Sequence, residues 1–369
     1  MGRPSPVGQR WRASAPGKSI LMGEHAAVYG RPALVAAVDR RLFAALTMEE
    51  REAGAPEVRL RLPALGVDER LAWSALADYA AERRRVWEEL QSGGAPGQFA
   101  KLRGEDKAHL VKAALGELLL FAGHRPERSA TLEIESELPL GSGFGSSAAC
   151  ATALLLAAAA ALEIGLSREQ LLQLALEVER RQHGAPSGVD NATVLHGGIL
   201  WADRDGEGRL RTRPLDLKSA SFLPRLRFFH TGEPAEPTGA VVAAVRARKE
   251  ADPAAFERRL DDMAAATEQL RQELEREAPD EGRVAGLFRR FESHLEAWGV
   301  VPPEVRQVIR EIESQGGAAK ISGAGSLSGP GAGSLLVLEP EKEGLDLAWP
   351  AGFQELELRL GAPGARLES

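Results

Sequence analysis

The sequence predicts a two-lobed protein that mixes strands and helices. Its 369 residues are enough for a substantial core. Short alternating or apolar segments are typical of strands, and longer amphipathic runs, concentrated in the second half, are typical of helices. A polar link at 204–218 separates the halves of the chain, and we expect the lobes to comprise residues 11–212 and 213–369.

Composition excludes several classes of protein. A hydrophobic content of 44% with 27% charged residues is typical of a globular chain. The net charge of -7 and the lack of a basic stripe argue against nucleic-acid binding. The single cysteine excludes an intramolecular disulfide framework and suits the cytoplasm. The most apolar run, 148–162, is mostly alanine and shorter than a membrane span, and the first twelve residues do not form a secretory signal.

The expected elements follow from periodicity and from turn residues. In the first half, Pro16-Gly17 indicates a turn, and Ser167 with Gln170 indicates a helix cap. We expect strands at 20–22, 33–46, 55–63, 129–138 and 199–201, helices at 71–90, 108–122, 147–165 and 167–182, and a loop at 92–97. In the second half we expect strands at 223–229, 334–338 and 355–360, and helices at 239–249, 253–276, 282–298 and 303–315.

The most distinctive stretch is the glycine-rich loop at 139–150. Glycines alternate with other residues, two serines follow, and an alanine-rich helix begins. A flexible loop that leads into a helix start leaves free N–H groups and the positive end of the helix dipole for an anion, so a phosphate site is our hypothesis and a plain turn is the alternative. A dinucleotide fingerprint would need glycine in place of Ser146, and the lysine of a P-loop is absent here.

Two polar clusters accompany this loop. Lys18, Glu24 and His25 crowd beside glycines near the N-terminus, where surface groups are the plain interpretation and a site is the alternative. Glu179, His183, Ser187 and Asp190 lie on a helix end and on the segment that leaves it. A simple turn is the plain interpretation of that segment, but such a cluster is also where a metal ion and a hydroxyl substrate could be held.

Three separated segments resemble the conserved motifs of a known enzyme family. Residues 15–18 with 23–25, 139–149 and 320–333 are similar to motifs one, two and three of the GHMP kinases, named for galacto-, homoserine, mevalonate and phosphomevalonate kinases. The resemblance covers about residues 13–338. Within the family, 23–30, 183–191 and 231–248 look most like mevalonate kinase. The chain departs from that pattern at Ala64, where animal relatives carry a nucleotide-contacting asparagine, and in a longer third loop.

The resemblance implies an α+β fold with a ribosomal-protein-like N-terminal lobe and a ferredoxin-like C-terminal lobe. The strand and helix pattern is compatible with this fold but would not alone select it. The implied activity is ATP-dependent phosphorylation of the primary hydroxyl of (R)-mevalonate to 5-phosphomevalonate, in the route to isoprenoids, sterols and other lipids. The alternatives are a GHMP kinase for another small alcohol or for phosphomevalonate, and a nucleotide-binding homologue without activity.

The resemblance also implies a role for individual residues. Asp190 would lie beside the attacking hydroxyl as base or orienting charge, with Lys18 close to it, and Ser147 and Glu179 would hold Mg²⁺. The nucleotide would be bound by Ser136, Gly141, Ser142, Gly143, Phe144, Gly145, Ser146 and Ser147. The substrate side would comprise Lys18, Glu24, His25, Asp190 and Thr238. His25, Lys18 and Arg246 are all candidates for the substrate carboxylate, and a homodimer is left open.

Overall fold

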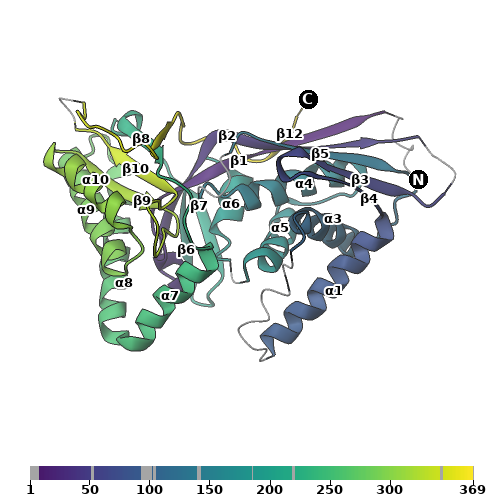
Figure 1. The fold of residues 1–369 in the computed structure, drawn as a ribbon, viewed down its shortest axis with the longest axis horizontal. Helices are drawn as coiled ribbons and strands as arrows, with labels where there is room; N and C mark the ends of the chain where they lie inside the picture. The colour runs from purple at the N-terminus through teal and green to yellow at the C-terminus, as the bar shows by residue number, and fades with distance from the viewer. Residues whose placement is uncertain are drawn as a thin grey trace.

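Two β-sheets organise the chain. The computed structural model describes residues 8–50, 54–92, 102, 105–138, 143–184, 186–217, 221–340 and 344–368. Figure 1 shows the larger sheet with helices beneath it at one end of the molecule, and the smaller sheet with a second group of helices at the other end. The expected mixture of helices and strands is therefore present, and buried apolar side chains of both parts join into one large core.

The larger sheet has eight strands within the described residues. Its main path is β12-β1-β2-β5-β3-β4, and β6 pairs with β2 and with β7. All neighbours are antiparallel except β3 and β5, which are parallel. The strands are β1 (Arg10–Met22), β2 (Ala33–Met48), β3 (Glu57–Leu62), β4 (Val67–Ala72), β5 (Ala130–Ser136), β6 (Ile199–Arg204), β7 (Leu210–Pro214) and β12 (Arg366–Glu368).

The expected turn at Pro16-Gly17 is wrong, because β1 continues through it. The β1–β2 register shifts between Pro16 and Gly17 instead. Gly17 is needed for close packing: a Cβ there would come within 2.4 Å of the Leu138 side chain and 3.1 Å of the Phe144 carbonyl oxygen. The glycine therefore lets Leu138 and Phe144 approach β1 closely.

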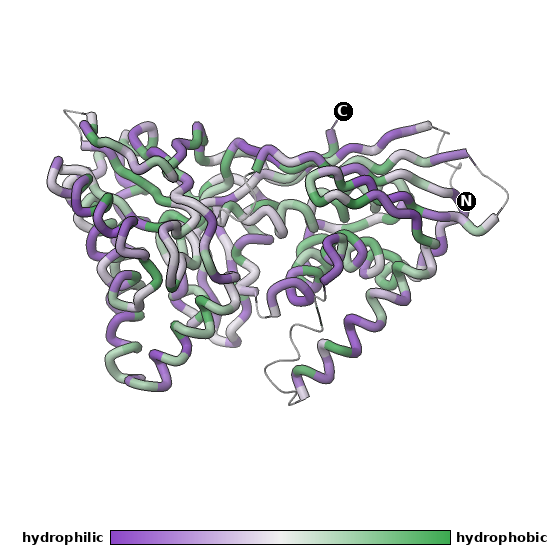
Figure 2. Tube along the Cα trace, in the orientation of Figure 1, coloured by the Kyte–Doolittle hydropathy of each residue, from purple (hydrophilic) through white to green (hydrophobic). Residues whose placement is uncertain are grey.

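The helices of this part cover one face of the large sheet (Figure 1). The central helix, α4, is alanine-rich and buried on almost every side, because its small side chains let it pack closely between β1, β2 and its neighbouring helices. The outer helix α1 instead alternates hydrophilic and hydrophobic turns, as Figure 2 shows. The helices are α1 (Trp73–Gln91), α3 (His109–Ala122), α4 (Ser146–Ala161), α5 (Arg168–His183) and α6 (Val189–His196).

The smaller sheet is antiparallel, in the order β11-β8-β10-β9. Helices α9 and α10 pack against β9. The strands are β8 (Leu226–His230), β9 (Ala318–Ser322), β10 (Ser334–Leu338) and β11 (Gln354–Leu356), and the helices are α7 (Thr238–Ala251), α8 (Pro253–Leu274), α9 (Glu281–Ala297) and α10 (Pro303–Ser314).

Local signals predicted most elements, and the exceptions have identifiable causes. The Ser167 cap is confirmed: its hydroxyl accepts from the Gln170 N–H, and the Gln170 side chain accepts from the Ser167 N–H. The sequence missed β4 and β7, whose half-exposed, charged residues lack an apolar stripe, and α6, which is short and follows a left-handed Gly188. It also missed residues 10–19 of β1, the strand β9, which leads directly into the third motif, and the three-residue β12. The strand expected at 355–360 is limited to β11. Apart from Ser92, the expected 92–97 loop lies outside the described residues.

The expected division at residues 212 and 213 stays a prediction. Strand β7 runs across that point, and the C-terminal strand β12 returns to pair with β1 of the larger sheet. Among the described residues, none of the helices combines the length and the apolar run that a membrane crossing requires.

Candidate active site

Lys18 and Asp190 form an ion pair although they are far apart in the sequence. Lys18 lies in β1 and Asp190 in the first turn of α6, and the Lys18 Nζ is 3.2 Å from the Asp190 Oδ2. The Lys18 side chain is 5% exposed and that of Asp190 is 36% exposed. The buried ammonium and the accessible carboxylate can therefore both interact with a group that enters the site from solvent.

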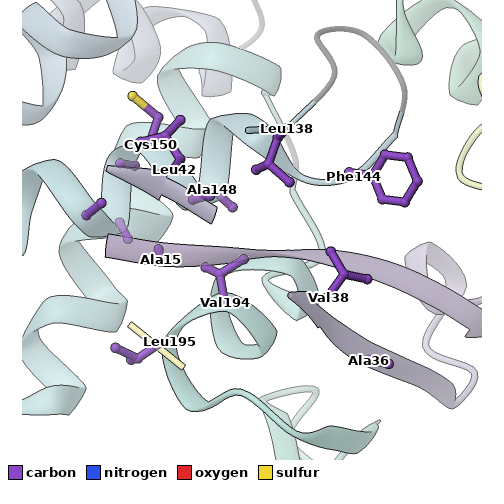
Figure 3. Close-up of a cluster of buried hydrophobic side chains, with 14 of the residues drawn as sticks. Ala15, Ala36, Val38, Leu42, Leu138, Phe144, Ala148, Cys150, Val194 and Leu195 are labelled. Atoms are coloured by element: carbon purple, nitrogen blue, oxygen red, sulfur yellow. The ribbon is translucent and has the colours of Figure 1, made fainter. Parts of the chain in front are cut away.

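The end of the glycine-rich loop lies directly on Lys18. The Lys18 N–H donates to the Phe144 carbonyl oxygen at 2.9 Å. Gly145, with a left-handed φ of 67°, precedes α4, and a Cβ at this position would lie 2.8 Å from the Lys18 Cγ. The Phe144 side chain is buried with Leu138 and Val38, and Figure 3 shows Leu138 and Phe144 close to the strand that carries Val38. The loop is thus anchored in the core beside the ion pair.

Ser147 and Glu179 lie next to this pair and share a neighbour, His183. The His183 Nε2 is 3.1 Å from the Ser147 Oγ and 3.6 Å from the Glu179 Oε2. Burial raises the pKa of the Glu179 carboxyl to about 8, and the charge of Asp190 adds to this rise. A hydrogen bond from Ser147 and the charge of Lys18 oppose it. The carboxyl of Glu179 therefore lies in a low-dielectric site close to the Lys18–Asp190 pair.

The residues present fit a divalent cation. The Glu179 Oε1 is buried and has no hydrogen-bond partner within the described part of the chain, so it is available as a ligand. A carboxylate and a hydroxyl are hard oxygen donors of the kind Mg²⁺ prefers. The described residues contain no cluster of three or more histidine, cysteine or acidic side chains that could hold a metal. A site with so few protein ligands suits Mg²⁺, which usually keeps waters and phosphate oxygens in its shell.

The other residues expected at the nucleotide lie around the start of α4. Ser146 is its first residue, and no side chain caps this helix end within the described ranges. Gly143, with a φ of 79°, faces β9, because a Cβ there would lie 3.1 Å from the Ser322 carbonyl oxygen. The exposed Ser136 bonds to the backbone of Leu138. The remaining two, Gly141 and Ser142, lie outside the described residues.

Glu24 and His25 contact the third motif, at 320–333. The Glu24 carboxylate pairs with Lys320, and both side chains are completely buried. Burial raises the pKa of Glu24, and the Lys320 charge opposes the rise. The His25 Nε2 is 2.9 Å from the Ala324 carbonyl oxygen, and burial lowers the pKa of its imidazole. Thr238, by contrast, is exposed at the first position of α7.

The roles of two residues did not emerge from the sequence. His183 stood out only as a member of a polar cluster, whereas in the structure it contacts both proposed metal ligands. Its spacing of four residues from Glu179 on one helix was the available signal, because such residues share a helix face. For Lys320 the only signal was its position in the third motif, since its partner Glu24 is at the other end of the chain.

Comparison with known proteins identifies the class. Residues 109–198 match the family model of the GHMP kinases N terminal domain. The crystal structure of L. major mevalonate kinase in complex with R-mevalonate has the same fold, with a TM-score of 0.66 at 23% identity, covering 93% of this chain and 91% of that one. The fold is therefore that of the GHMP kinases, and the expected α+β fold is confirmed.

Curated relatives narrow the class to one family. The chain is 31% identical to the mevalonate kinase of Mus musculus, covering 96% of this chain and 94% of that protein. It is 30% identical to the mevalonate kinase of Archaeoglobus fulgidus, covering 90% and 98%. The chain belongs to the mevalonate kinase family, and the family predicted from the three motifs is confirmed.

Proposed function

We propose that the protein transfers the γ-phosphoryl group of ATP to the primary hydroxyl of (R)-mevalonate, giving 5-phosphomevalonate and ADP. Membership of the mevalonate kinase family supports the substrate. The observation that carries the mechanism is the Lys18–Asp190 ion pair, 3.2 Å long, beside the glycine-lined start of α4. The alcohol would bind at this ion pair, next to the terminal phosphate of the nucleotide.

Asp190 receives or orients the proton of the attacking hydroxyl. An ordinary aspartate is a weak base for an alcohol, but the loose transition state of phosphoryl transfer requires little early deprotonation. Its partly exposed carboxylate can accept the O–H hydrogen bond and direct the oxygen at phosphorus. Lys18, held under Gly145, offsets the negative charge that spreads over the transferred group.

The phosphates of the nucleotide would be bound by the N–H groups at the start of α4 and by the residues 143–147 that lead into it. Free N–H groups and the helix dipole favour an anion there without a lysine in the loop. The Ser147 hydroxyl and the Glu179 carboxylate would hold Mg²⁺, which would supply positive charge to offset that of the phosphate groups. His183 would orient these two ligands, since its imidazole reaches both.

The substrate side lies between Lys18 and α7 in our proposal. Of the three cationic candidates for the mevalonate carboxylate, Lys18 and His25 are buried, whereas Arg246 is exposed on α7. This difference favours Arg246. Thr238 would lie on the same side, while Glu24 and His25 would act through their contacts with the third motif. The expected cytoplasmic location and a homodimer stay predictions.

The decisive variant is Asp190→Asn, assayed by ADP release with mevalonate. We expect kcat to fall by about 100-fold or more, as for the loss of a group that handles a proton. ATP binding measured by calorimetry should stay close to that of the unmodified protein. Asp68→Asn is the matched control, because Asp68 also pairs with a cation, Arg59, but lies in β4 at the edge of the large sheet. Near-normal turnover of Asp190→Asn would refute the assignment.

A panel of alcohols in the same assay separates the alternative functions. Turnover with mevalonate alone supports the proposal. Preference for another small alcohol or for phosphomevalonate would make the protein a different GHMP kinase. ATP binding without turnover on any alcohol would indicate a homologue that has lost catalysis.

A further inference from the structure

A cluster of three ionisable side chains, Glu24, Lys320 and Glu292, is buried beside the site and has no role in the proposed chemistry. Lys320 of β9 pairs with Glu24, and its Nζ also donates to the Ile321 carbonyl oxygen at 2.7 Å. Glu292 of α9 accepts from the Ile321 N–H at 3.0 Å. Glu24, Lys320 and Glu292 are each 1% exposed or less. Burying charges is costly unless the partners are well placed, so such a cluster demands a structural or functional reason.

Further contacts join the same two segments. The Ser322 hydroxyl lies 3.1 Å from that of Ser19, accepts from the Ile20 N–H at 3.0 Å and lies 3.0 Å from the Ile20 carbonyl oxygen. His25 reaches the Ala324 carbonyl oxygen at 2.9 Å. We call these contacts between 19–25 and 320–324 the β1–β9 seam. These contacts connect β1, the strand that carries Lys18, to the first residues of the third motif, 320–333.

The seam also borders residues 143–145, the described end of the glycine-rich loop, which we call the phosphate loop. Gly143 lies so close to Ser322 that a Cβ on Gly143 would be 3.1 Å from the Ser322 carbonyl oxygen. A Cβ on Gly323 would be 3.8 Å from the Gly143 Cα. The Lys18 N–H of β1 donates a hydrogen bond to the Phe144 carbonyl oxygen. The end of β9 therefore touches the loop that precedes α4, and β1 touches it one residue later.

We propose that the Glu24–Lys320 ion pair is a positioning device for phosphoryl transfer rather than a substrate contact. By fixing the end of β9 against β1, the pair sets the place of the phosphate loop relative to Lys18 and Asp190. Both side chains are completely buried, so neither reaches a ligand in the site. Glu24 and Lys320 are then positioning residues, and this inference rests on the proposed kinase function.

The test is a double-mutant cycle with Glu24→Gln, Lys320→Met and the double variant. Either single change leaves a buried group without its partner, so we expect each to lower kcat by about tenfold or more, because a misplacement of about 1 Å can cost about 100-fold. The affinity for MgATP, measured by calorimetry without alcohol, should fall, while KM for mevalonate changes less. The double variant should be no worse than either single one, since no unpaired charge remains.

Controls separate positioning from stability. Asp262→Asn and Arg290→Met break an ion pair between α8 and α9 that lies outside the seam and is more exposed than the Glu24–Lys320 pair. They should lower the melting temperature without changing kcat or ATP affinity. If Lys320→Met does not fold, Lys320→Arg keeps the charge but not the shape, and it should still weaken MgATP binding.

Two results would overturn the inference. One is a Glu24→Gln protein with a raised KM for mevalonate, unchanged ATP affinity and an effect additive with Lys320→Met, which would make Glu24 a substrate contact. The other is a cycle in which only the melting temperature changes. Because ATP affinity is measured without alcohol, both results can be distinguished from a wrong choice of substrate.

Discussion

Gly145 is the position where one added methyl group should disturb catalysis most directly. It precedes α4 with a φ of 67°, and the Cβ of an alanine would lie 2.8 Å from the Lys18 Cγ and 3.1 Å from its Cε. Lys18 cannot swing away, because its side chain is 5% exposed and its N–H is bonded to Phe144. Gly145→Ala should therefore shift the Lys18 ammonium relative to Asp190.

The size of the effect follows from two contributions. A left-handed alanine costs about 1–2 kcal/mol of stability wherever it occurs. The contact with Lys18 must also lengthen by about 0.7 Å to reach an ordinary carbon–carbon separation of about 3.5 Å. Since a misplacement of about 1 Å can cost about 100-fold in rate, we expect kcat to fall by about 10- to 100-fold.

Gly123→Ala is the matched control. Gly123 ends α3 with a similar φ of 57°, and a Cβ there would meet nothing within 4 Å. Both variants should lose a comparable amount of thermal stability from backbone strain, and only Gly145→Ala should lose turnover in the ADP-release assay with mevalonate. Equal kcat values for the two variants would refute the assignment of Lys18 to the reacting centre.

Two further predictions concern buried charges. Burial raises the pKa of Glu292 well above its usual value, with the charges of Glu24 and Glu296 adding to the rise and Lys320 opposing it. The protonated carboxyl is thus favoured by folding: its contribution to stability is complete below the unfolded pKa near 4.5 and is lost as pH rises through the folded pKa. In thermal melts across this window, the unmodified protein should lose stability relative to Glu292→Gln as pH rises, and parallel curves would contradict the reasoning. Arg41, which is 8% exposed, donates to Ser14 and to the carbonyl oxygens of 363 and 364 in the C-terminal segment. Arg41→Met should lower the free energy of unfolding in urea by about 2–4 kcal/mol, because hydrogen bonds from a charged group are the strong ones. Its neighbour Arg40 is exposed and makes one long hydrogen bond, to the Glu357 carbonyl oxygen, so Arg40→Met should lower the free energy of unfolding by less than about 0.5 kcal/mol. Equal losses of stability in the two variants would contradict the conclusion that the Arg41 hydrogen bonds stabilise the C-terminal segment.

Local sequence signals succeeded where short-range chemistry decides the outcome. The Ser167 cap and the helices of the second half followed from residues within a few positions of one another. The turn expected at Pro16-Gly17 failed because Gly17 serves a distant neighbour, Leu138, and not its own backbone. Strand β4 was missed because an edge strand with charged residues shows no apolar alternation.

For the site, the sequence supplied the set of residues and, through the family resemblance, the proximity of some of them, but not their contacts. Three motifs identified the family, and Lys18, Ser147, Glu179 and Asp190 were named as a set. The distances between them, and the contact of His183 with Ser147 and Glu179, follow only from the packing of β1, α4, α5 and α6.

The clearest division concerns the polar residues of the first motif. The sequence by itself determined that Lys18, Glu24 and His25 are crowded beside glycines at the end of a strand. The family resemblance already implied that Lys18 lies close to Asp190, and the two form an ion pair in the structure. Only the tertiary structure decided that Glu24 is buried against Lys320. The physical reason is that periodicity reports the face of an element on which a side chain lies. Whether that face meets solvent, a ligand or a charge from the other end of the chain depends on which distant segment packs against it.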